Sequence, residues 1–464
     1  MYYLQSRWKL ENNVLYYYGL RNKKDMFHNK IKLSPKQCSV IAALPKELDE
    51  NEKEILNRLL GIQVVLQDKR RNIPKTLSEA TFCKTCCAND FMIPGLEFDD
   101  KGCCPMCQTA TDTKQLKSVV PLVDNIPRSK KSRFDIAVFY TGGKDSTFLL
   151  YYLSKIRKLR VLALTWEIPF MSASAKASIE GAKKSFENVE FITRTISQID
   201  LKKVYRKLYA LSSNTCACPS LAYLLFYPEL VSNRVPYFVA GNEPVQMLGL
   251  YYNHMAPKIA YTFANNKFLA FLFNIGRILT LHPPLHQGQF QTLMTMKQLA
   301  YGDHPFKKIS GFQNELVSNV VEAIHEVPEL LLPFKRSIRR SSWSGNVPAF
   351  VHFDFNQICG GTYYWDKVKE ILIKNCGWIA PDEDKKALHT SCNIEKCKDH
   401  TQFSLFYHCK SKIIPFSAIE ISLASRNCGR SQEETIYEIE NLLGFSLTEI
   451  PECAIMRDYL EVAE

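Results

Sequence analysis

The sequence predicts an α/β protein with a doubly wound parallel sheet, accompanied by a cysteine-rich ribbon and a small N-terminal module. Three observations support this prediction. Short apolar runs alternate with helical patterns from residue 134 to residue 240, a glycine-bearing loop joins the first run to its helix, and cysteines cluster before residue 110. Because strands that alternate with helices form a parallel sheet, ligands are expected at the carboxyl ends of the strands.

Residues 1–80 differ in character from the rest of the chain. They contain a β-like opening around residues 14–18, a polar helical pattern at 48–60 and a short apolar strand at 62–66. This pattern predicts either a small winged-helix-like recognition module or a simple packing extension. The remaining chain is divided into a ribbon at 81–112, a linker at 113–133, the sheet domain at 134–300 and a mainly helical substrate region at 301–464.

Two Cys-x-x-Cys knuckles, at 83–86 and 104–107, follow the N-terminal module. The predicted ligands are Cys83, Cys86, Cys104 and Cys107. Four thiolates at this spacing suit one tetrahedral Zn²⁺ ion, and the metal replaces the core that so short a segment cannot build. Cys87 and Cys103 are neighbours that could each replace a ligand, and an iron–sulfur cluster is the alternative occupant.

A buried strand from Ile136 to Tyr140 leads through a glycine loop into an apolar helix. The loop consists of Thr141, Gly142, Gly143, Lys144, Asp145 and Ser146. Two adjacent glycines can adopt φ > 0 and bring their N–H groups to an anion, at which the helix dipole also points. The pattern predicts a phosphate-binding loop in which Asp145 holds a divalent cation, Lys144 neutralises charge and Ser146 donates its hydroxyl. It is neither a Walker A loop nor a dinucleotide fingerprint.

This loop resembles the Ser-Gly-Gly-x-Asp-Ser loop of the ATP pyrophosphatases, the adenine nucleotide alpha-hydrolase-like superfamily, with Thr141 in the place of the first serine. The resemblance implies a HUP-like domain that binds ATP and Mg²⁺. In such proteins a substrate oxygen attacks the α-phosphate, which gives an adenylated intermediate and free pyrophosphate.

Further elements complete the predicted sheet. Strands are expected at 161–166, 189–193 and 235–240, and a helix is expected at 174–186. Thr165 and Trp166, at the end of the second strand, are expected near the adenine, with a place in the core as the alternative for Trp166. Gly241 and Glu243 follow the last of these strands at the mouth of the same site, where Glu243 could bind metal, substrate or a general-acid proton.

The cysteine knuckles upstream of this loop resemble the opening of the N-acetyl sugar amidotransferases of surface-polysaccharide biosynthesis. The similar segments farther on are Trp365-Asp366, Gly377-Trp378 and His389-Thr390-Ser391-Cys392. The resemblance covers roughly residues 80–440 and implies that ATP activates an acetamido carbonyl whose oxygen ammonia replaces. It also implies that Gly142, Gly143, Asp145 and Ser146 hold ATP and magnesium, and that Glu243 faces the substrate.

Three features depart from that family. The N-terminal module has no counterpart there, which suggests a bulky or carrier-bound substrate. Cys216 and Cys218 follow the third strand and its helix, where they could deliver sulfur as a persulfide or ligate a catalytic [4Fe–4S] cluster. The third feature is the spacing of His389, Cys392, Cys397 and His400, which is a possible metal-ligand set. For both groups of cysteines the alternative is half-buried free thiols.

Composition limits the class of protein. Hydrophobic residues make up 46% of the chain, which predicts a packed core, and 16 clustered cysteines in a cytoplasmic protein favour metal or redox chemistry. The opening residues lack the apolar core of a signal peptide, and the interrupted apolar stretch 268–281 predicts a buried helix, so no membrane partner is expected. The net charge of +12 permits nucleic acid, and the basic run 335–340 predicts an exposed charged turn or a phosphate contact.

The residues therefore support three hypotheses. The first is an ATP-dependent, AMP-forming enzyme that adenylates an amide or carboxyl oxygen of an N-acetyl sugar-like substrate and replaces it with nitrogen, with ammonia from solution or a partner protein. The second keeps the adenylation but inserts sulfur, forming a thioamide or a thiolated tRNA, through Cys216 and Cys218 or an iron–sulfur cluster. A partner protein could donate the sulfur. The third is a non-catalytic, ATP-sensing protein that binds nucleic acid.

Overall fold

The computed structural model describes residues 1–21, 30–68, 72–108, 122–212, 217–253, 267–286, 288–302, 315–381, 386–388 and 391–461. Cys216, His389 and residues 113–121 of the predicted linker lie outside these residues. The strands are β1 (Tyr2–Leu4), β2 (Trp8–Glu11), β3 (Val14–Tyr17), β4 (Lys30–Lys32), β5 (Val65–Gln67), β6 (Ile136–Phe139), β7 (Val161–Trp166), β8 (Val189–Arg194), β9 (Tyr237–Ala240) and β10 (Ala349–Phe350).

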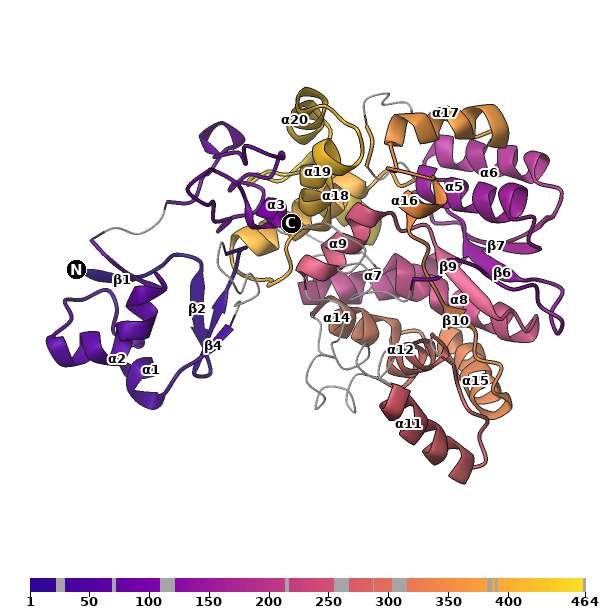
Figure 1. Cartoon of the computed structure of the whole chain (residues 1–464), viewed down its shortest axis with the longest axis horizontal. Coiled ribbons are helices and arrows are strands. Elements are labelled where there is room, and N and C mark those ends of the chain that lie inside the picture. The colour runs from indigo at the N-terminus through magenta and orange to yellow at the C-terminus, as the bar shows by residue number, and fades with distance from the viewer. Residues whose placement is uncertain are drawn as a thin grey trace.

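Helices account for most of the remaining described residues (Figure 1). In the N-terminal half they are α1 (Pro35–Ala42), α2 (Glu50–Gly61), η1 (Leu77–Glu79), α3 (Pro105–Gln108), α5 (Lys144–Tyr151), η2 (Tyr152–Ile156), α6 (Ala173–Ser185), α7 (Gln198–Ser212) and α8 (Cys218–Ser232). In the C-terminal half they are α9 (Pro244–Tyr252), α11 (Lys267–Leu279), α12 (Gln289–Tyr301), α14 (Glu315–Ile324), α15 (Pro328–Ser344), α16 (Phe355–Ile358), α17 (Trp365–Cys376), α18 (Glu395–Tyr407), α19 (Phe416–Asn427), α20 (Gln432–Asn441) and α21 (Pro451–Leu460).

The central sheet is parallel throughout, with the strand order β10-β9-β6-β7-β8. The α/β prediction is therefore confirmed. Strand β7 is buried along its whole length, as expected for a parallel strand covered on both faces. The sequence reading missed β10, because a two-residue edge strand leaves no periodicity to detect.

The two faces of the sheet pack against different helices. Val138 and Ala163 point into a core with helices α5, α6 and α17. Ala137 and Leu162, one residue earlier on the same strands, point into a second core with α7, α8, α12 and α15. Figure 1 shows α5, α6 and α17 on one side of the strands and α8, α12 and α15 on the other. The alternation follows from the period of two residues in a strand.

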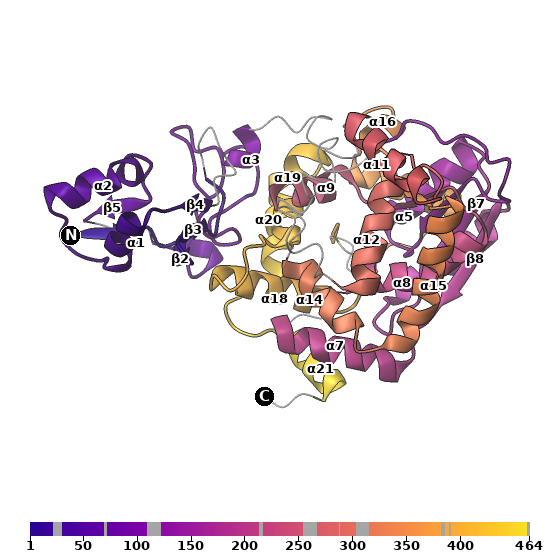
Figure 2. The ribbon, with the colours of Figure 1, turned by 90° about the horizontal axis from the view of Figure 1, so that it is seen from below.

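The N-terminal module has its own small core. It consists of the antiparallel pair β1-β5, the antiparallel sheet β2-β3-β4, and helices α1 and α2. The predicted helix at 48–60 corresponds to α2, which Asp49 caps by accepting the Glu52 N–H at 2.8 Å. The module lies at one end of the molecule, and the ribbon lies between it and α18–α20 (Figures 1 and 2).

A buried arginine joins the N-terminal module to the C-terminal helices. Arg7 is 1% exposed and donates to the carbonyl oxygens of Tyr18 at 2.6 Å, Tyr407 at 2.7 Å and Phe406 at 2.8 Å. Two of these carbonyls belong to the last turn of α18, where a cation also compensates the helix dipole. The first and last thirds of the chain are thus docked together.

Two expectations about single elements were wrong. The apolar stretch 268–281 forms α11, but this helix is exposed on one face instead of buried, because its polar residues make the inward contacts. The basic run 335–340 belongs to the long helix α15 and is no turn, although Arg336, Arg339 and Arg340 are exposed as expected.

Candidate functional site

The glycine loop connects the central strand β6 to α5 at the carboxyl edge of the sheet. Gly142 has a φ of +74°, and a Cβ atom there would lie 2.4 Å from the Ala175 carbonyl oxygen. Gly143 is the residue that caps α5. The conformation of Gly142 requires glycine. The turn directs the first N–H groups of the helix to the end of the strand, where an anion would be stabilised.

Two hydroxyl groups hold the loop in this conformation. The oxygens Thr141 Oγ1 and Ser146 Oγ lie 3.1 Å apart, and Ser146 also donates to the Gly143 carbonyl at 3.1 Å. Trp378 closes the other side, because its indole N–H donates to the Gly142 carbonyl at 3.1 Å. The loop is therefore shaped before any ligand binds.

Lys144 points into the protein and contacts two carboxylates. Its side chain is 3% exposed, and its ammonium group pairs with Asp145 Oδ1 and lies 3.7 Å from Glu243 Oε2. The structure thus brings together the three charged residues that the sequence reading selected, from the loop and from the turn after β9. The Lys144 ammonium faces the carboxylates, and its expected role in neutralising phosphate charge stays a prediction.

Two aromatic residues complete this cluster. Tyr363 donates its hydroxyl to Asp145 Oδ1 at 2.7 Å, and the Trp365 indole N–H donates to Glu243 Oε2. The Lys144 ammonium lies 4.7 Å from the centre of the Tyr363 ring and 5.0 Å from that of Trp365, within the range of cation–π attraction. Sequence reasoning missed Tyr363, since nothing in its local pattern connects it to a loop so distant in the chain.

The charges in this cluster shift two pKa values. Burial raises the pKa of Glu243 to about 8, and the negative charge of Asp145 adds to the effect, while Lys144 and Trp365 oppose it. Burial alone would lower the pKa of Lys144, but Asp145 and Glu243 outweigh it and the pKa is raised. At neutral pH Glu243 therefore holds a proton, while Lys144 keeps its positive charge.

Gly241 brings the turn after β9 against the start of α5. A Cβ atom on Gly241 would lie 2.5 Å from the Ser146 nitrogen and 2.6 Å from its Cα atom. Only glycine permits this approach, which carries Glu243 to Lys144. Gly241 thus has a structural role, and its expected contact with ATP stays a prediction.

Thr165 and Trp166 are both buried at the end of β7. The Thr165 hydroxyl donates to the Tyr140 carbonyl at 2.9 Å, which ties β7 to the last residue before the loop. Trp166 is 8% exposed and packs in the core shared with α7 and α8, where its indole N–H has no hydrogen-bond partner among the described residues. This position agrees with the core alternative, and contact with adenine stays a prediction.

Cys218 is the first residue of α8 and is half-buried. Because α8 leads into the parallel strand β9, its first turn lies at the carboxyl edge of the sheet, as the glycine loop does. Cys216 belongs to the residues outside the described part of the chain, so the pair is placed only in part.

The four predicted metal ligands converge. One ligand atom from each of Cys83, Cys86, Cys104 and Cys107 lies within 4.8 Å of all the others. The Cys86 and Cys104 sulfurs are 3.8 Å apart, which matches the separation of about 3.8 Å that follows from tetrahedral coordination with metal–sulfur bonds of about 2.3 Å. Backbone N–H groups of Thr85 and Cys104 donate to the Cys83 sulfur at 3.4 Å and 3.3 Å, as expected around a thiolate.

The two neighbouring cysteines point elsewhere. The Cys87 sulfur lies 3.7 Å from the Ser425 hydroxyl oxygen on α19, and the Cys103 sulfur lies 3.2 Å from the Thr85 hydroxyl oxygen. The alternative ligand sets are therefore wrong.

Among the described residues, the four ribbon cysteines are the one group of side chains that could hold a metal ion, so Cys392, Cys397 and His400 do not form a second metal site there. Cys397 instead packs in a core next to Cys453, and the Cys453 sulfur lies 3.9 Å from the Cys397 carbonyl oxygen.

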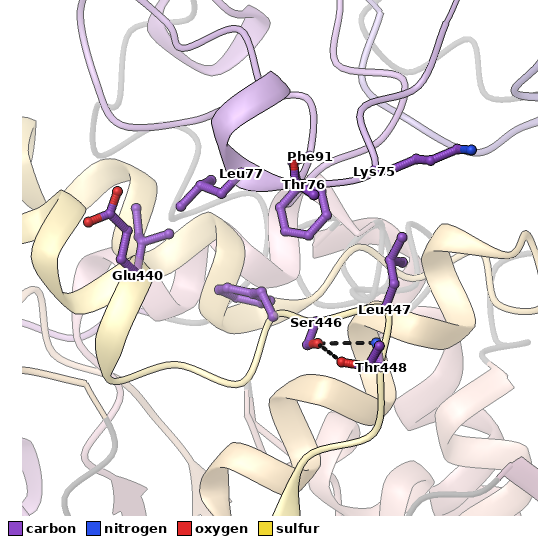
Figure 3. A pocket seen from close by; sticks show the side chains of 10 residues that line it. Lys75, Thr76, Leu77, Phe91, Glu440, Ser446, Leu447 and Thr448 are labelled. Atoms are coloured by element: carbon purple, nitrogen blue, oxygen red, sulfur yellow. Dashed lines mark hydrogen bonds between the residues drawn. The ribbon is translucent and has the colours of Figure 1, made fainter.

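A separate surface groove lies where the ribbon meets the end of α20 (Figure 3). It has a volume of about 380 Å³. Thr76, Leu77 and Phe91 lie on one side, and Glu440 and Leu447 on the other. None of its lining residues belongs to the glycine loop or the Lys144 cluster, so this groove is not the phosphate site.

Among known proteins, similarity to this chain is found in solved structures only. No protein-family model and no curated protein matches the chain. Among solved structures, the U34-tRNA thiolase NcsA from Methanococcus maripaludis, determined with its [4Fe-4S] cluster, aligns with 56% of this chain and 86% of its own, at 17% identity and a TM-score of 0.23. A similarity at this TM-score carries no argument about function. In the described residues, no helix is long and apolar enough to cross a membrane.

The ribbon geometry predicts one bound metal ion per chain. Replacing a ligand in Cys86→Ser should lower metal affinity by at least about 100-fold, because three thiolates no longer close the tetrahedron. Mass spectrometry of the metal content of purified protein measures this. Cys87→Ser, one residue away, is the matched control and should retain the metal; loss of metal in Cys87→Ser alone would contradict the ligand assignment.

The raised pKa of Glu243 predicts how stability depends on pH. The unfolded chain releases the Glu243 proton near the ordinary pKa of 4.5, whereas the folded chain keeps it up to about pH 8. The free energy of unfolding therefore falls as the pH rises from about 4.5 to about 8, and this group causes no further change with pH above that range. Glu243→Gln, which has no such proton, should show a flatter profile of melting temperature against pH. The exposed Glu370→Gln is the control, and a wild-type slope in Glu243→Gln would contradict the assignment.

Proposed function

We propose that this chain is an ATP-dependent enzyme that adenylates an oxygen of an organic substrate and releases pyrophosphate and then AMP. The observation that carries the proposal is the glycine loop at the carboxyl end of the central strand, with Asp145 and Glu243 beside it. Backbone N–H groups at the start of α5 are suited to the phosphates of ATP. Asp145 is suited to a magnesium ion on those phosphates, because it is the more exposed of the two carboxylates, at 17% against 1% for Glu243.

Each charged residue then has a distinct part. Lys144, held between two carboxylates and two rings, positions Asp145 and Glu243 and offsets the negative charge that gathers when ATP binds. Glu243 holds a proton at neutral pH, which it can donate to or share with a reacting oxygen. ATP supplies the activated phosphorus and the pyrophosphate leaving group; the remaining contribution of the chain is positioning.

For the nucleophile we propose nitrogen, with an acetamido or related amide oxygen as the group replaced. Trp365 and Trp378 support this choice, because they lie in the two segments that resemble N-acetyl sugar amidotransferases and both contact the site, at Glu243 and Gly142. Ammonia would come from solution or from a partner protein. The substrate is expected to be a small molecule or carrier-bound.

Sulfur insertion is the second candidate, and Cys218 is the observation that favours it. A half-buried thiol at the carboxyl edge of the sheet can carry a persulfide or ligate a cluster close to an adenylated oxygen. The four-cysteine ribbon does not decide between the candidates. We propose that it holds structural Zn²⁺, since four thiolates fill the coordination sphere of one ion, whereas a [4Fe–4S] cluster binds each thiolate on a different iron and needs wider spacing.

Asp145→Asn tests the adenylation. The variant keeps the size of the side chain but loses the charge that would hold magnesium, so ATP–pyrophosphate exchange with a panel of nucleotide-linked N-acetyl sugars should fall by at least about 100-fold. Metal content and circular dichroism should stay unchanged. Asp458→Asn, on the exposed side of α21, is the control. Full exchange activity in Asp145→Asn would remove the loop from the mechanism, and absence of exchange in the wild-type protein would favour the ATP-sensing hypothesis.

The double variant Cys216→Ser/Cys218→Ser separates nitrogen from sulfur. If nitrogen is the nucleophile, protein purified without oxygen should contain no acid-labile sulfide, and its iron content and pyrophosphate exchange should be the same in wild type and variant. Iron and sulfide measured by colorimetric assay, together with the exchange rate, provide the readout. Iron with matching sulfide in the wild type that the variant loses would overturn nitrogen transfer and establish the sulfur candidate.

A further inference from the structure

Helix α11 is oriented with its apolar side outward. Its exposed residues recur at intervals of three and four, which places them on one face. They are Phe268, Phe271, Leu272, Ile275, Ile278 and Leu279, with exposed fractions from 38% to 78%, and Leu281 follows at 80%. So many large apolar side chains on one helix exceed the scattered exposure that is normal for a soluble surface.

The polar residues of α11 make the inward contacts. The Asn274 side chain donates to the Leu285 carbonyl at 2.9 Å and accepts from the Leu285 N–H at 2.8 Å. Arg277, 7% exposed, donates to the carbonyls of Pro283 at 2.7 Å and Ser342 at 2.8 Å. These hydrogen bonds fix the rotation of the helix about its axis, so the apolar face is held outward by the fold.

The end of α15 continues this surface with aromatic and basic side chains. Trp343 is 63% exposed, and its ring centre lies 5.3 Å from that of His282, which follows α11. Arg336, Arg339 and Arg340 precede it on the exposed side of α15, and none of the three forms an ion pair with a described residue. In Figure 1 both helices lie at the lower edge of the molecule.

Helix α11 contains no acidic residue, and α15 contains only Glu329, in its first turn. Residues 244–302 and 330–353 lack aspartate and glutamate altogether, although 47 occur in the chain. The surface therefore combines an apolar helix face, an exposed tryptophan and three arginines that have no ion pair among the described residues. This combination is the one that peripheral amphipathic helices use at an anionic lipid surface.

We propose that α11 and the end of α15 form a peripheral contact with an anionic membrane surface, with the apolar face of α11 in the headgroup region and the arginines on the lipid phosphates. The proposal departs from the sequence-based expectation of no membrane partner, and it is independent of the proposed function. It requires no spanning segment, since a helix of 13 residues lying in the interface buries only one face.

A second copy of the chain is the less suitable occupant. An isologous dimer brings the same patch of both subunits together, so that the arginines of one copy would approach those of the other with no carboxylate of this surface between them. Such like charges oppose association, whereas anionic headgroups neutralise them. Charge complementarity thus selects the lipid surface.

Vesicle binding of the full chain tests the proposal. Vesicles of equal parts phosphatidylcholine and phosphatidylglycerol should cosediment with the protein and shift its tryptophan fluorescence to shorter wavelength, a shift that Trp343→Phe should largely remove. Vesicles of phosphatidylcholine alone should bind at least about tenfold more weakly, and added salt should weaken binding to the anionic vesicles.

Two double variants and a control identify the surface. Phe271→Ser/Ile275→Ser should reduce binding by at least about tenfold through lost apolar burial, and Arg336→Gln/Arg340→Gln by about 30-fold through lost charge. Ile199→Ser/Ile455→Ser removes apolar side chains that are 71% and 54% exposed on α7 and α21, and should leave binding within about twofold of wild type.

The same variants provide the contrary outcomes. No binding of the wild-type chain to anionic vesicles, or equal binding by all variants, would overturn the proposal. Sedimentation that shows a dimer of the wild-type chain which Phe271→Ser/Ile275→Ser converts to a monomer would assign the surface to a second copy instead. Unchanged circular dichroism and metal content in each variant confirm that the comparison is made between folded proteins.

Discussion

The buried ammonium of Lys144 is the constraint on which the site depends. A charge without contact to water costs several kcal/mol unless groups around it compensate the loss of hydration. Here two carboxyl groups and two aromatic faces do so, and they come from the loop, the turn after β9 and the segment around the start of α17. The cluster therefore forms only when three distant parts of the chain have folded together. Since Glu243 holds a proton at neutral pH, it adds no second negative charge to the buried cluster.

The four-cysteine ribbon connects two other parts of the chain. Its Cys87 N–H donates to the Ser422 carbonyl on α19 at 3.2 Å, and the Gly95 carbonyl accepts from the Tyr17 hydroxyl at 2.6 Å. The ribbon thus contacts the N-terminal module on one side and the C-terminal helices on the other. Because a segment this short has little core of its own, the ion that closes it would also stabilise both contacts.

Sequence reasoning located the parts of the site that are encoded locally. Strand, glycine loop and helix follow one another without interruption from Phe134 to Leu153, and the two cysteine knuckles have a characteristic spacing, so both could be recognised before their contacts were known. The direction of the Lys144 side chain could not, since it depends on Glu243 and on Tyr363, 219 residues away. The docking of Arg7 on α18, 400 residues apart in the chain, is equally invisible to a reading of local periodicity.

Helix α11 shows why an apolar pattern alone does not predict burial. The stretch contains enough phenylalanine, leucine and isoleucine to suggest a core helix, and the sequence reading treated Asn274 and Arg277 as interruptions. In the structure those two side chains are the attachment points, because the carbonyls of Leu285, Pro283 and Ser342 need donors that apolar residues cannot supply. Once the polar residues are used inward, the apolar face has to point outward. The stability of the fold and the character of this surface therefore follow from the same few hydrogen bonds.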